Sequence, residues 1–230
     1  MSSVRQTHNG YAVKLGELKV TVSLGRIEEC DYAADNTLVA LPANEFFDDE
    51  CIHDSNSALG AFMKCHFAND ISKIQSLVSE QLANKPTKDV EKTPGEFARS
   101  YGIGTCVYLN KPLALDQRIA MIAVTTQRAD VGLRADASYI FAAAENLFRT
   151  MANHRLTRLH IPIIGSGHGG LKSEVSLISM LIAFGELNRM RAYRIRDINI
   201  VVFKRDDASE AAVSSGTIRR ALDFASRFLA

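Results

Sequence analysis

The feature that most constrains the fold is the alternation of short apolar runs with amphipathic stretches in the second half of the chain. The runs are typical of strands, and the stretches repeat apolar residues every three or four positions, as helices do. Strands are predicted at residues 105–109, 119–125, 159–164 and 198–203, and helices at 136–151, 173–187 and 217–229. This order favours an α/β fold with a largely parallel sheet and helices on both of its faces.

The first half of the chain carries weaker signals of the same kind. Residues 18–22 alternate as a half-buried strand does, and residues 37–41 form an apolar run that we expect to end at Pro42. Residues 54–57, Asp-Ser-Asn-Ser, offer side chains that cap helices and precede an apolar stretch, which predicts a helix start. A second helix is predicted at residues 71–82 because their apolar residues share one stripe.

Length and charge limit the class of protein. A chain of 230 residues is long for one domain and short for two, and we expect a single domain, 1–230. Within it, residues 1–14 are expected to form an N-terminal extension. Residues 84–97, with two prolines and a glycine, are expected to form a surface loop. The net charge of +1 argues against nucleic acid or an anionic membrane as a partner.

Cysteines and apolar runs exclude further classes. The four cysteines form no Cys-x-x-Cys pair, which argues against a zinc ribbon or a thioredoxin motif. Cys51-Ile52-His53 and Cys65-His66 could suggest a metal site, but ordinary core and loop positions are the favoured interpretation, and we expect no metal. The first ten residues lack the apolar core of a signal peptide. The longest apolar stretch, around residues 178–184, is far too short to span a bilayer. We therefore expect a cytoplasmic domain without a bound cofactor.

A glycine-rich loop is the strongest indication of function. Gly165-Ser166-Gly167-His168-Gly169-Gly170 follows the predicted strand 159–164 and directly precedes a predicted helix. Ligands of open α/β sheets bind at the carboxyl ends of strands. Glycines let backbone N–H groups approach an oxyanion, and the helix N-terminus adds partial positive charge. The loop therefore predicts a phosphate site.

Two familiar phosphate motifs fit this loop poorly. A Rossmann fingerprint belongs to the first strand–helix unit and needs an acidic residue about 20 positions later, after another strand. Here the one remaining strand leads into Lys204-Arg205. A P-loop needs lysine directly after the last glycine, and Leu171 occupies that place. A tight turn without any ligand is the structural alternative, although four glycines in six residues exceed what a turn requires.

Two further segments support a third interpretation. Val39-Ala40-Leu41-Pro42-Ala43-Asn44 resembles the macrodomain strand that ends in Ala-Asn, and residues 163–170 resemble the second phosphate loop of that family. The chain is most similar to the macro domains of Thoeris anti-phage effectors of the ThsA type, in which transmembrane helices precede the macro domain. The matching stretches are Arg99-Ser100-Tyr101-Gly102-Ile103-Gly104-Thr105, residues 162–171 and residues 198–204.

This resemblance implies both a fold and a function. The implied fold is a three-layer α/β/α macrodomain with a mixed, largely parallel sheet of about six strands. The implied function is binding, without turnover, of an ADP-ribose-derived nucleotide signal, such as histidine-ADP-ribose or a cyclic ADP-ribose. In that family a TIR-domain enzyme makes the signal from NAD, and binding drives homo-oligomerisation. An upstream transmembrane segment would place the domain at the cytoplasmic face of the bacterial inner membrane.

The chain also departs from the macrodomain pattern. The first phosphate loop of macrodomains is rich in glycine, whereas residues 45–54 contain none and are strongly acidic. An aspartate that reads adenine in macrodomains is replaced by Arg26. These changes argue against hydrolysis of ADP-ribosyl links, which remains the catalytic alternative beside a general ADP-ribose reader, and they favour a modified ligand.

The candidate site residues follow from the loop and from the resemblance. We expect the N–H groups of Ser166 to Gly170 to bind the diphosphate, with Leu171 beside them. Asn44 is the candidate for a ribose hydroxyl, or alternatively a strand-end cap. Ser55 and Asn56 are candidates for a second anion site, or only for helix capping. Tyr101 and Ile103 are candidates to wall the adenine or ribose, or only to pack in the core.

The acidic run Asp48-Asp49-Glu50 would repel a diphosphate. We therefore expect it either to point away from the site or to meet a cation on the ligand, such as the amine of an attached amino acid.

Overall fold

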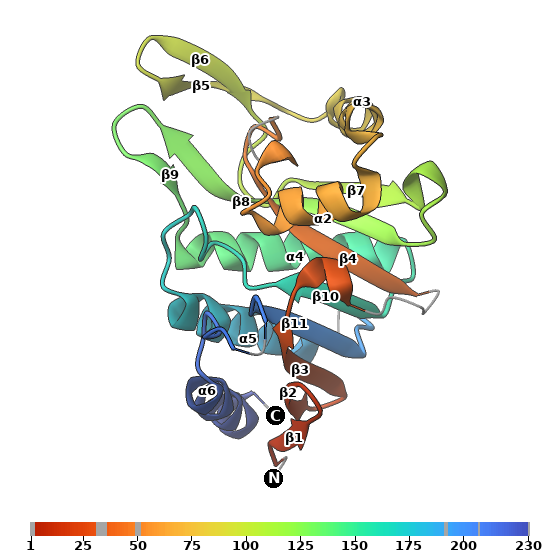
Figure 1. The fold of residues 1–230 in the computed structure, drawn as a ribbon, viewed down its shortest axis with the longest axis vertical. Helices are drawn as coiled ribbons and strands as arrows, with labels where there is room; N and C mark the ends of the chain where they lie inside the picture. Colours follow the sequence, from red (N-terminus) through yellow and green to blue (C-terminus); the bar gives the residue numbers. More distant parts are fainter. Residues whose placement is uncertain (1–2, 31–35, 49–51, 191–192, 207, 230) are drawn as a thin grey trace.

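The structure is built on one mixed sheet, seen nearly edge-on in parts of Figure 1. The computed structural model describes residues 3–30, 36–48, 52–190, 193–206 and 208–229. The strand order is β1 (Arg5–Thr7), β2 (Gly10–Leu15), β3 (Leu18–Gly25), β11 (Asp197–Phe203), β10 (Arg158–Pro162), β4 (Thr37–Asn44), β8 (Arg118–Arg128) and β7 (Cys106–Asn110). A ninth strand, β9 (Gly132–Arg134), pairs with β8 outside this path.

The centre of the sheet is parallel and its margins are antiparallel. β3, β11, β10, β4 and β8 pair in parallel, whereas β1, β2, β7 and β9 join in antiparallel pairs. The predicted α/β class with a largely parallel sheet is confirmed. The expected number of about six strands was too low, because the marginal strands carry weak sequence signals.

The described part of the expected N-terminal extension, residues 3–14, joins the main sheet. β1 and β2 are part of the main sheet, where β2 pairs along its whole length with β3. Val13 and Leu15 of β2 are buried in the core. Burial of these two side chains holds an edge hairpin that the short, mixed sequence did not indicate.

Two helical layers cover the sheet. α4 (Ala137–Asn153), α5 (Ser173–Arg189) and α6 (Ser215–Phe228) cover one face, and α2 (Ala58–Phe67) and α3 (Ile71–Leu82) cover part of the other (Figure 1). Side chains along β4 alternate between the two cores: Leu38 and Ala40 pack toward α4 and α5, Val39 and Leu41 toward α2 and α3. The predicted helices are confirmed, and α3 has the predicted bounds.

β4 continues past Pro42 to Asn44, although the sequence predicted that the strand would stop at the proline. Pairing with β10 ends at Val39, while pairing with β8 continues through Ala43 and Asn44. A proline lacks the N–H that a ladder bond requires, and Pro42 is tolerated because the pairing of β4 with β10 has already ended at Val39.

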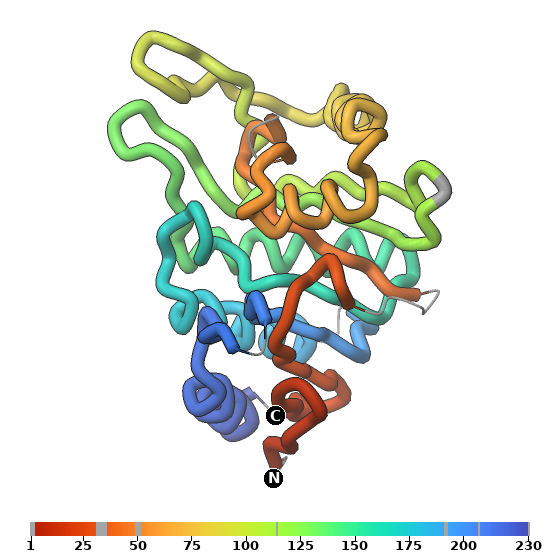
Figure 2. Tube along the Cα trace, in the orientation of Figure 1, coloured from red at the N-terminus to blue at the C-terminus, as the bar shows by residue number. Residues whose placement is uncertain are grey.

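Residues 84–97 also differ from the prediction of a surface loop. β5 (Lys88–Thr93) and β6 (Glu96–Ser100) form a two-stranded hairpin. Pro94 and Gly95, the latter at φ 79°, stand at the centre of its turn, which are the residues that a type II turn prefers. Figure 2 shows this hairpin and the β8–β9 hairpin projecting from the same end of the molecule.

A buried carboxylate anchors the β5–β6 hairpin to the sheet. Glu45, directly after β4, is 2% exposed and pairs with Arg128 of β8. The Ser100 hydroxyl at the end of β6 donates to the same carboxylate. The backbone of Glu45 donates to Thr125 O at 3.0 Å and accepts from the Tyr101 N–H at 2.9 Å. Three separate segments therefore meet at one residue.

We expect Glu45→Ala to lower the free energy of unfolding by about 2 kcal/mol, because it leaves the buried Ser100 hydroxyl without its acceptor and removes the partner of the partly exposed Arg128. Urea denaturation measures this change. Glu145→Gln is the matched control, since Glu145 pairs with Arg149 on the exposed face of α4. The control should change stability by less than about 0.5 kcal/mol, and equal effects of the two substitutions would contradict the anchoring role.

Candidate functional site

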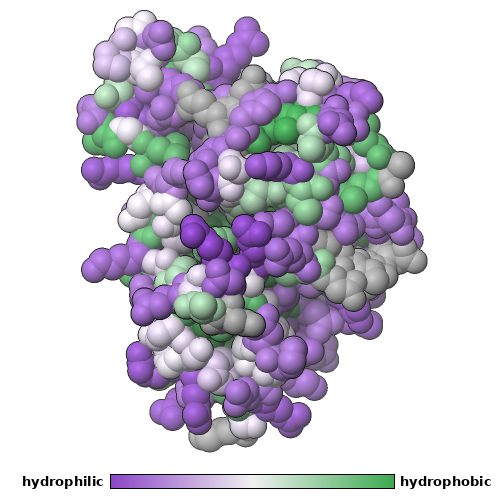
Figure 3. All heavy atoms as spheres, viewed as in Figure 1, coloured by the Kyte–Doolittle hydropathy of each residue, from purple (hydrophilic) through white to green (hydrophobic). Residues whose placement is uncertain are grey.

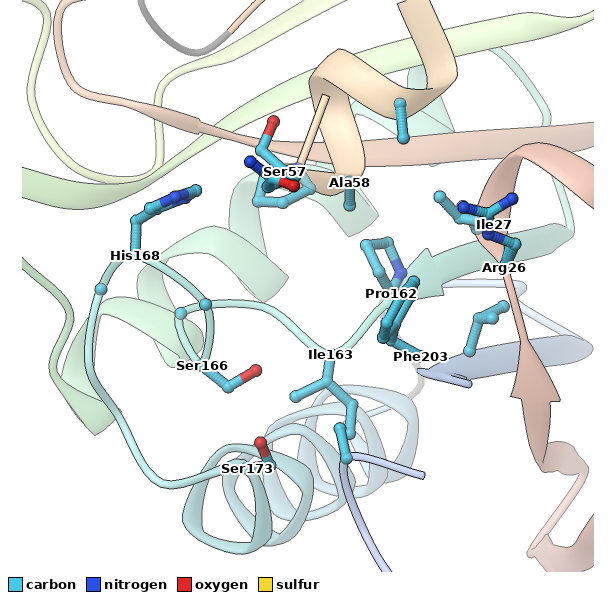
Figure 4. Close-up of a pocket in the computed structure, with 18 of the residues that line it drawn as sticks. Arg26, Ile27, Ser57, Ala58, Pro162, Ile163, Ser166, His168, Ser173 and Phe203 are labelled. Atoms are coloured by element: carbon cyan, nitrogen blue, oxygen red, sulfur yellow. The ribbon is translucent and has the colours of Figure 1, made fainter. Parts of the chain in front are cut away.

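A cleft of about 480 Å³ opens at the carboxyl edge of the parallel strands. This volume lies within the range of small-molecule sites. Residues at or near the carboxyl ends of five strands line it: Gly25 of β3, Pro42 and Ala43 of β4, Val124 and Thr125 of β8, Pro162 of β10, and Val201 and Phe203 of β11. Figure 4 shows the glycine-rich loop on one side of this cleft and Ser57 and Ala58 of the α2 segment on another. The expected location of the site is therefore a real cavity.

The glycine-rich loop connects β10 to α5 and bends sharply. Gly165 and Gly170 have φ values of 78° and 70°, a region that favours glycine. The Leu171 N–H donates to Gly165 O and the Gly170 N–H donates to Gly167 O, each at 3.1 Å. Gly169 O accepts from the Ala135 N–H at 2.8 Å. These bonds hold the loop closed on itself and on the segment before α4.

Four consecutive amides of this loop remain available. Within the described residues, the N–H groups of Ser166, Gly167, His168 and Gly169 donate no hydrogen bond. All four residues line the cleft. The Gly170 amide, expected to bind the ligand with them, is already engaged inside the loop. Unpaired N–H groups grouped in this way are suited to binding an anion.

The N-terminus of α5 adds to the positive potential behind the loop. Lys172 precedes the helix and gives no side-chain cap, and Ser173, the first helical residue, lines the cleft. The first N–H groups of a helix have no intrahelical partner and attract anions. Figure 4 shows Ser173 below the loop, on the same side of the cleft as Ser166.

The facing wall is the segment that begins α2. Ser55, Asn56 and Ser57 line the cleft. The Ser57 hydroxyl accepts from the Gly60 N–H at 2.9 Å and donates to Asp54 O at 2.8 Å, so it caps the helix as predicted. The Asn56 N–H donates to Asp54 Oδ1 at 2.9 Å. The side chains of Ser55 and Asn56 are exposed, beside an N-terminus of a second helix.

The far end of the cleft combines an aromatic ring with a charged pair. Phe203 at the end of β11 is 54% exposed and lines the cleft. Arg26 Nε lies 3.4 Å from Glu28 Oε1, and the Glu28 side chain is only 9% exposed. That Nε is buried without a hydrogen-bond partner among the described residues. Neither Phe203 nor Glu28 was identified from the sequence. The position of Phe203 at the carboxyl end of a predicted strand could have marked it as a candidate.

Five of the predicted site residues do not line the cleft. Asn44 is 1% exposed, its Oδ1 accepts from the Phe46 N–H at 3.0 Å, and its Nδ2 donates to Asp48 at 3.0 Å. Tyr101 packs edge-on against Phe47, with ring centroids 6.1 Å apart. Neither these two residues nor Ile103 lines the cavity. Gly170 and Leu171 belong to the loop and donate its internal hydrogen bonds, but they do not line the cleft either.

Asp48, the first residue of the acidic run, meets a cation from the protein itself. Asp48 Oδ2 lies 2.8 Å from the Lys92 ammonium of the β5–β6 hairpin. Asp49 and Glu50 lie outside the described residues. Asp48 does not line the cleft, which agrees with the expectation that the run points away from the site rather than meeting a cation on the ligand.

Other chemistry finds little support. Among the described residues, no group of three histidine, cysteine or acidic side chains is arranged to hold a metal ion. Burial raises the pKa of the Cys106 thiol to about 11, so this cysteine is a neutral thiol at pH 7 rather than a nucleophile. None of the described helices has the length and apolar composition needed to cross a membrane.

Polar and apolar residues are interspersed on the face seen in Figure 3.

Comparison with known families decides the relationship. The family model described as "Thoeris protein ThsA, Macro domain" matches residues 20–203. The chain belongs to the Thoeris ThsA macro-domain family. The match covers the sheet from β3 to β11 and the whole glycine-rich loop. The sequence matches no curated protein.

Solved structures confirm the macrodomain fold. The Oceanobacillus iheyensis macrodomain with MES bound has a TM-score of 0.62 at 10% identity, and the comparison covers 97% of both chains. A variant of that macrodomain with ADPR has a TM-score of 0.55 at 12% identity, covering 97% of this chain and 98% of the other. The Trypanosoma brucei macrodomain in complex with ADP has a TM-score of 0.58 at 7% identity, covering 88% and 68%.

The glycine-rich loop of this ThsA-type macro domain should tolerate a methyl group at Gly167 but not at Gly169. A Cβ at Gly169 would lie 2.7 Å from Gly165 O and from Ala135 Cβ, whereas a Cβ at Gly167 would meet nothing within 4 Å. We expect Gly169→Ala to lower stability by about 1–3 kcal/mol because the loop must shift. Gly167→Ala should change it by less than about 0.5 kcal/mol. Thermal unfolding of both variants checks the contrast.

Proposed function

We propose that the cleft binds the diphosphate of an ADP-ribose-derived nucleotide and that the domain acts as a sensor without turnover. The four unpaired amides of Ser166 to Gly169, next to the N-terminus of α5, are the observation that supports this most strongly. A diphosphate offers several acceptor oxygens, which match a row of donors better than a single carboxylate does.

The two ends of the cleft suggest how such a nucleotide lies. With the diphosphate on the glycine-rich loop, the opposite wall offers Ser55 and Asn56 to a phosphate oxygen or a ribose hydroxyl. The base then reaches Phe203, whose exposed ring is a stacking surface, and the Arg26–Glu28 pair beside it. The macrodomains of similar fold with ADPR or ADP support this class of ligand. A ribose contact by Asn44 would require its amide to leave Phe46 and Asp48.

Family membership supports the identity of the signal and its consequence. We propose that a TIR-domain enzyme makes the ligand, an ADP-ribose derivative such as histidine-ADP-ribose or a cyclic ADP-ribose, during anti-phage defence. In this proposal ligand binding promotes homo-oligomerisation of a cytoplasmic or membrane-tethered effector. The small molecule is the link between the two proteins, and nucleic acid has no part.

We expect ADP-ribose to bind with measurable heat and AMP to bind at least about tenfold more weakly, because AMP lacks the diphosphate that the amides recognise. Phe203→Ala should weaken ADP-ribose binding about tenfold, since stacking of a base on an aromatic ring is worth about 1–3 kcal/mol. Isothermal titration calorimetry measures both. Phe228→Ala is the control, because Phe228 is 69% exposed on α6 and does not line the cleft. Equal affinities for AMP and ADP-ribose would rule out the proposed diphosphate site.

Binding without turnover makes a separate prediction. Incubation with ADP-ribosylated protein should release no ADP-ribose, because the candidate Asn44 is buried and already hydrogen-bonded on both amide atoms. Chromatography of the released nucleotide provides the measurement. Steady release in proportion to enzyme concentration would instead support the hydrolase alternative.

A further inference from the structure

A side-chain pair joins the two walls of the cleft at its rim. His168 Nε2 of the glycine-rich loop lies 3.0 Å from Asp54 Oδ2, just before α2. The loop follows β10 and the Asp54 segment follows β4, so the contact connects segments that are far apart in the sequence. Figure 4 shows His168 extending from the loop toward the wall that carries Ser57.

Asp54 is held firmly on its own side. Its Oδ1 accepts from the Asn56 N–H at 2.9 Å, and its carbonyl accepts from the Ser57 N–H and the Ser57 hydroxyl at 2.9 and 2.8 Å. Gly60 of α2 lies so close that a Cβ there would be 2.1 Å from Asp54 O. The carboxylate is therefore presented to His168 from a rigid support.

The pair does not occupy the anion site. With the contact formed, the cleft still has a volume of about 480 Å³. Within the described chain, the amides of Ser166 to Gly169 remain without acceptors, so Asp54 takes none of them. The side chains of His168 and Asp54 are 53% and 32% exposed, as expected for groups on a rim.

We propose that the His168–Asp54 pair is a strap that closes over the bound diphosphate and limits how fast a ligand enters and leaves. The inference rests on the proposed function for the identity of the ligand. Because the pair joins the two walls across the rim, we expect it to open when a nucleotide with groups on both sides of its diphosphate enters or leaves. Asp54 thus acts as a positioning residue that holds the imidazole of His168 across the cleft.

Stopped-flow kinetics with ADP-ribose tests the strap. Asp54→Asn and His168→Gln should each raise both the association and the dissociation rate constants by about fivefold, the size expected for a partly exposed contact between two polar side chains. The double variant should be no faster than either single variant, because both remove the same contact. The exchanged variant Asp54→His with His168→Asp should return toward the slow rates. A general loosening of the structure would not be rescued by this exchange.

Asp116→Asn is the matched control. It removes one negative charge at the start of β8, at the opposite edge of the sheet from the cleft, where Asp116 pairs with Lys111. Its rates should equal those of the unsubstituted protein. Unchanged rates in Asp54→Asn, or additive effects in the double variant, would overturn the strap.

The strap and the proposed function can fail separately. If neither ADP-ribose nor histidine-ADP-ribose nor a cyclic ADP-ribose binds, the proposed function is overturned, and the same rate measurements are made with inorganic pyrophosphate. Faster exchange of pyrophosphate in the single variants would still support the strap. If pyrophosphate also fails to bind, the proposed strap is overturned as well, because no diphosphate then binds beneath the His168–Asp54 pair.

Discussion

The parallel pairing of β3, β11, β10, β4 and β8 is the constraint on which the site depends. Parallel strands place all of their carboxyl ends at one edge, and the connections that follow them must open there. β4 leads toward α2 on one face and β10 leads to α5 on the other, so two helix N-termini flank one cleft. A change of register between β10 and β11 would move the glycine-rich loop, and the free N–H groups that it carries, away from the α2 segment.

Hydrogen bonds that involve buried groups fix the edges of this arrangement. Glu45 joins the end of β4 to β8 and to the β5–β6 hairpin, so the strand end beside the cleft is held by side chain and backbone together. The glycine-rich loop is fixed differently, by backbone bonds to itself and to Ala135. The bonds within the loop use the N–H groups of Gly170 and Leu171, and the N–H groups of Ser166 to Gly169 donate no hydrogen bond among the described residues. A binding surface made of backbone is insensitive to side-chain rotation, which keeps the donors preorganised.

The sequence predicted the elements that carry their own periodic signal. α3 has an apolar stripe and was predicted to the residue, and the loop after β10 was identified by its glycines and its position. The hairpin of β5 and β6 was missed because its strands are mostly exposed and its prolines and glycine read as a loop. Asn44 was assigned by resemblance, whereas its burial depends on Phe46 and Asp48, which no local pattern shows. Glu28 reaches the cleft only because β3 leads into a short 3-10 helix there.

The close packing of Asp54 on Gly60 fixes one wall of the cleft, because a Cβ at Gly60 would lie 2.1 Å from Asp54 O. The facing turn is also filled at Gly169, where a Cβ would lie 2.7 Å from Gly165 O, whereas Gly167 has open space around it. Both walls therefore admit larger residues at few positions. Changes in ligand preference are then confined to the side chains that project from the rim, while the main chain keeps its course.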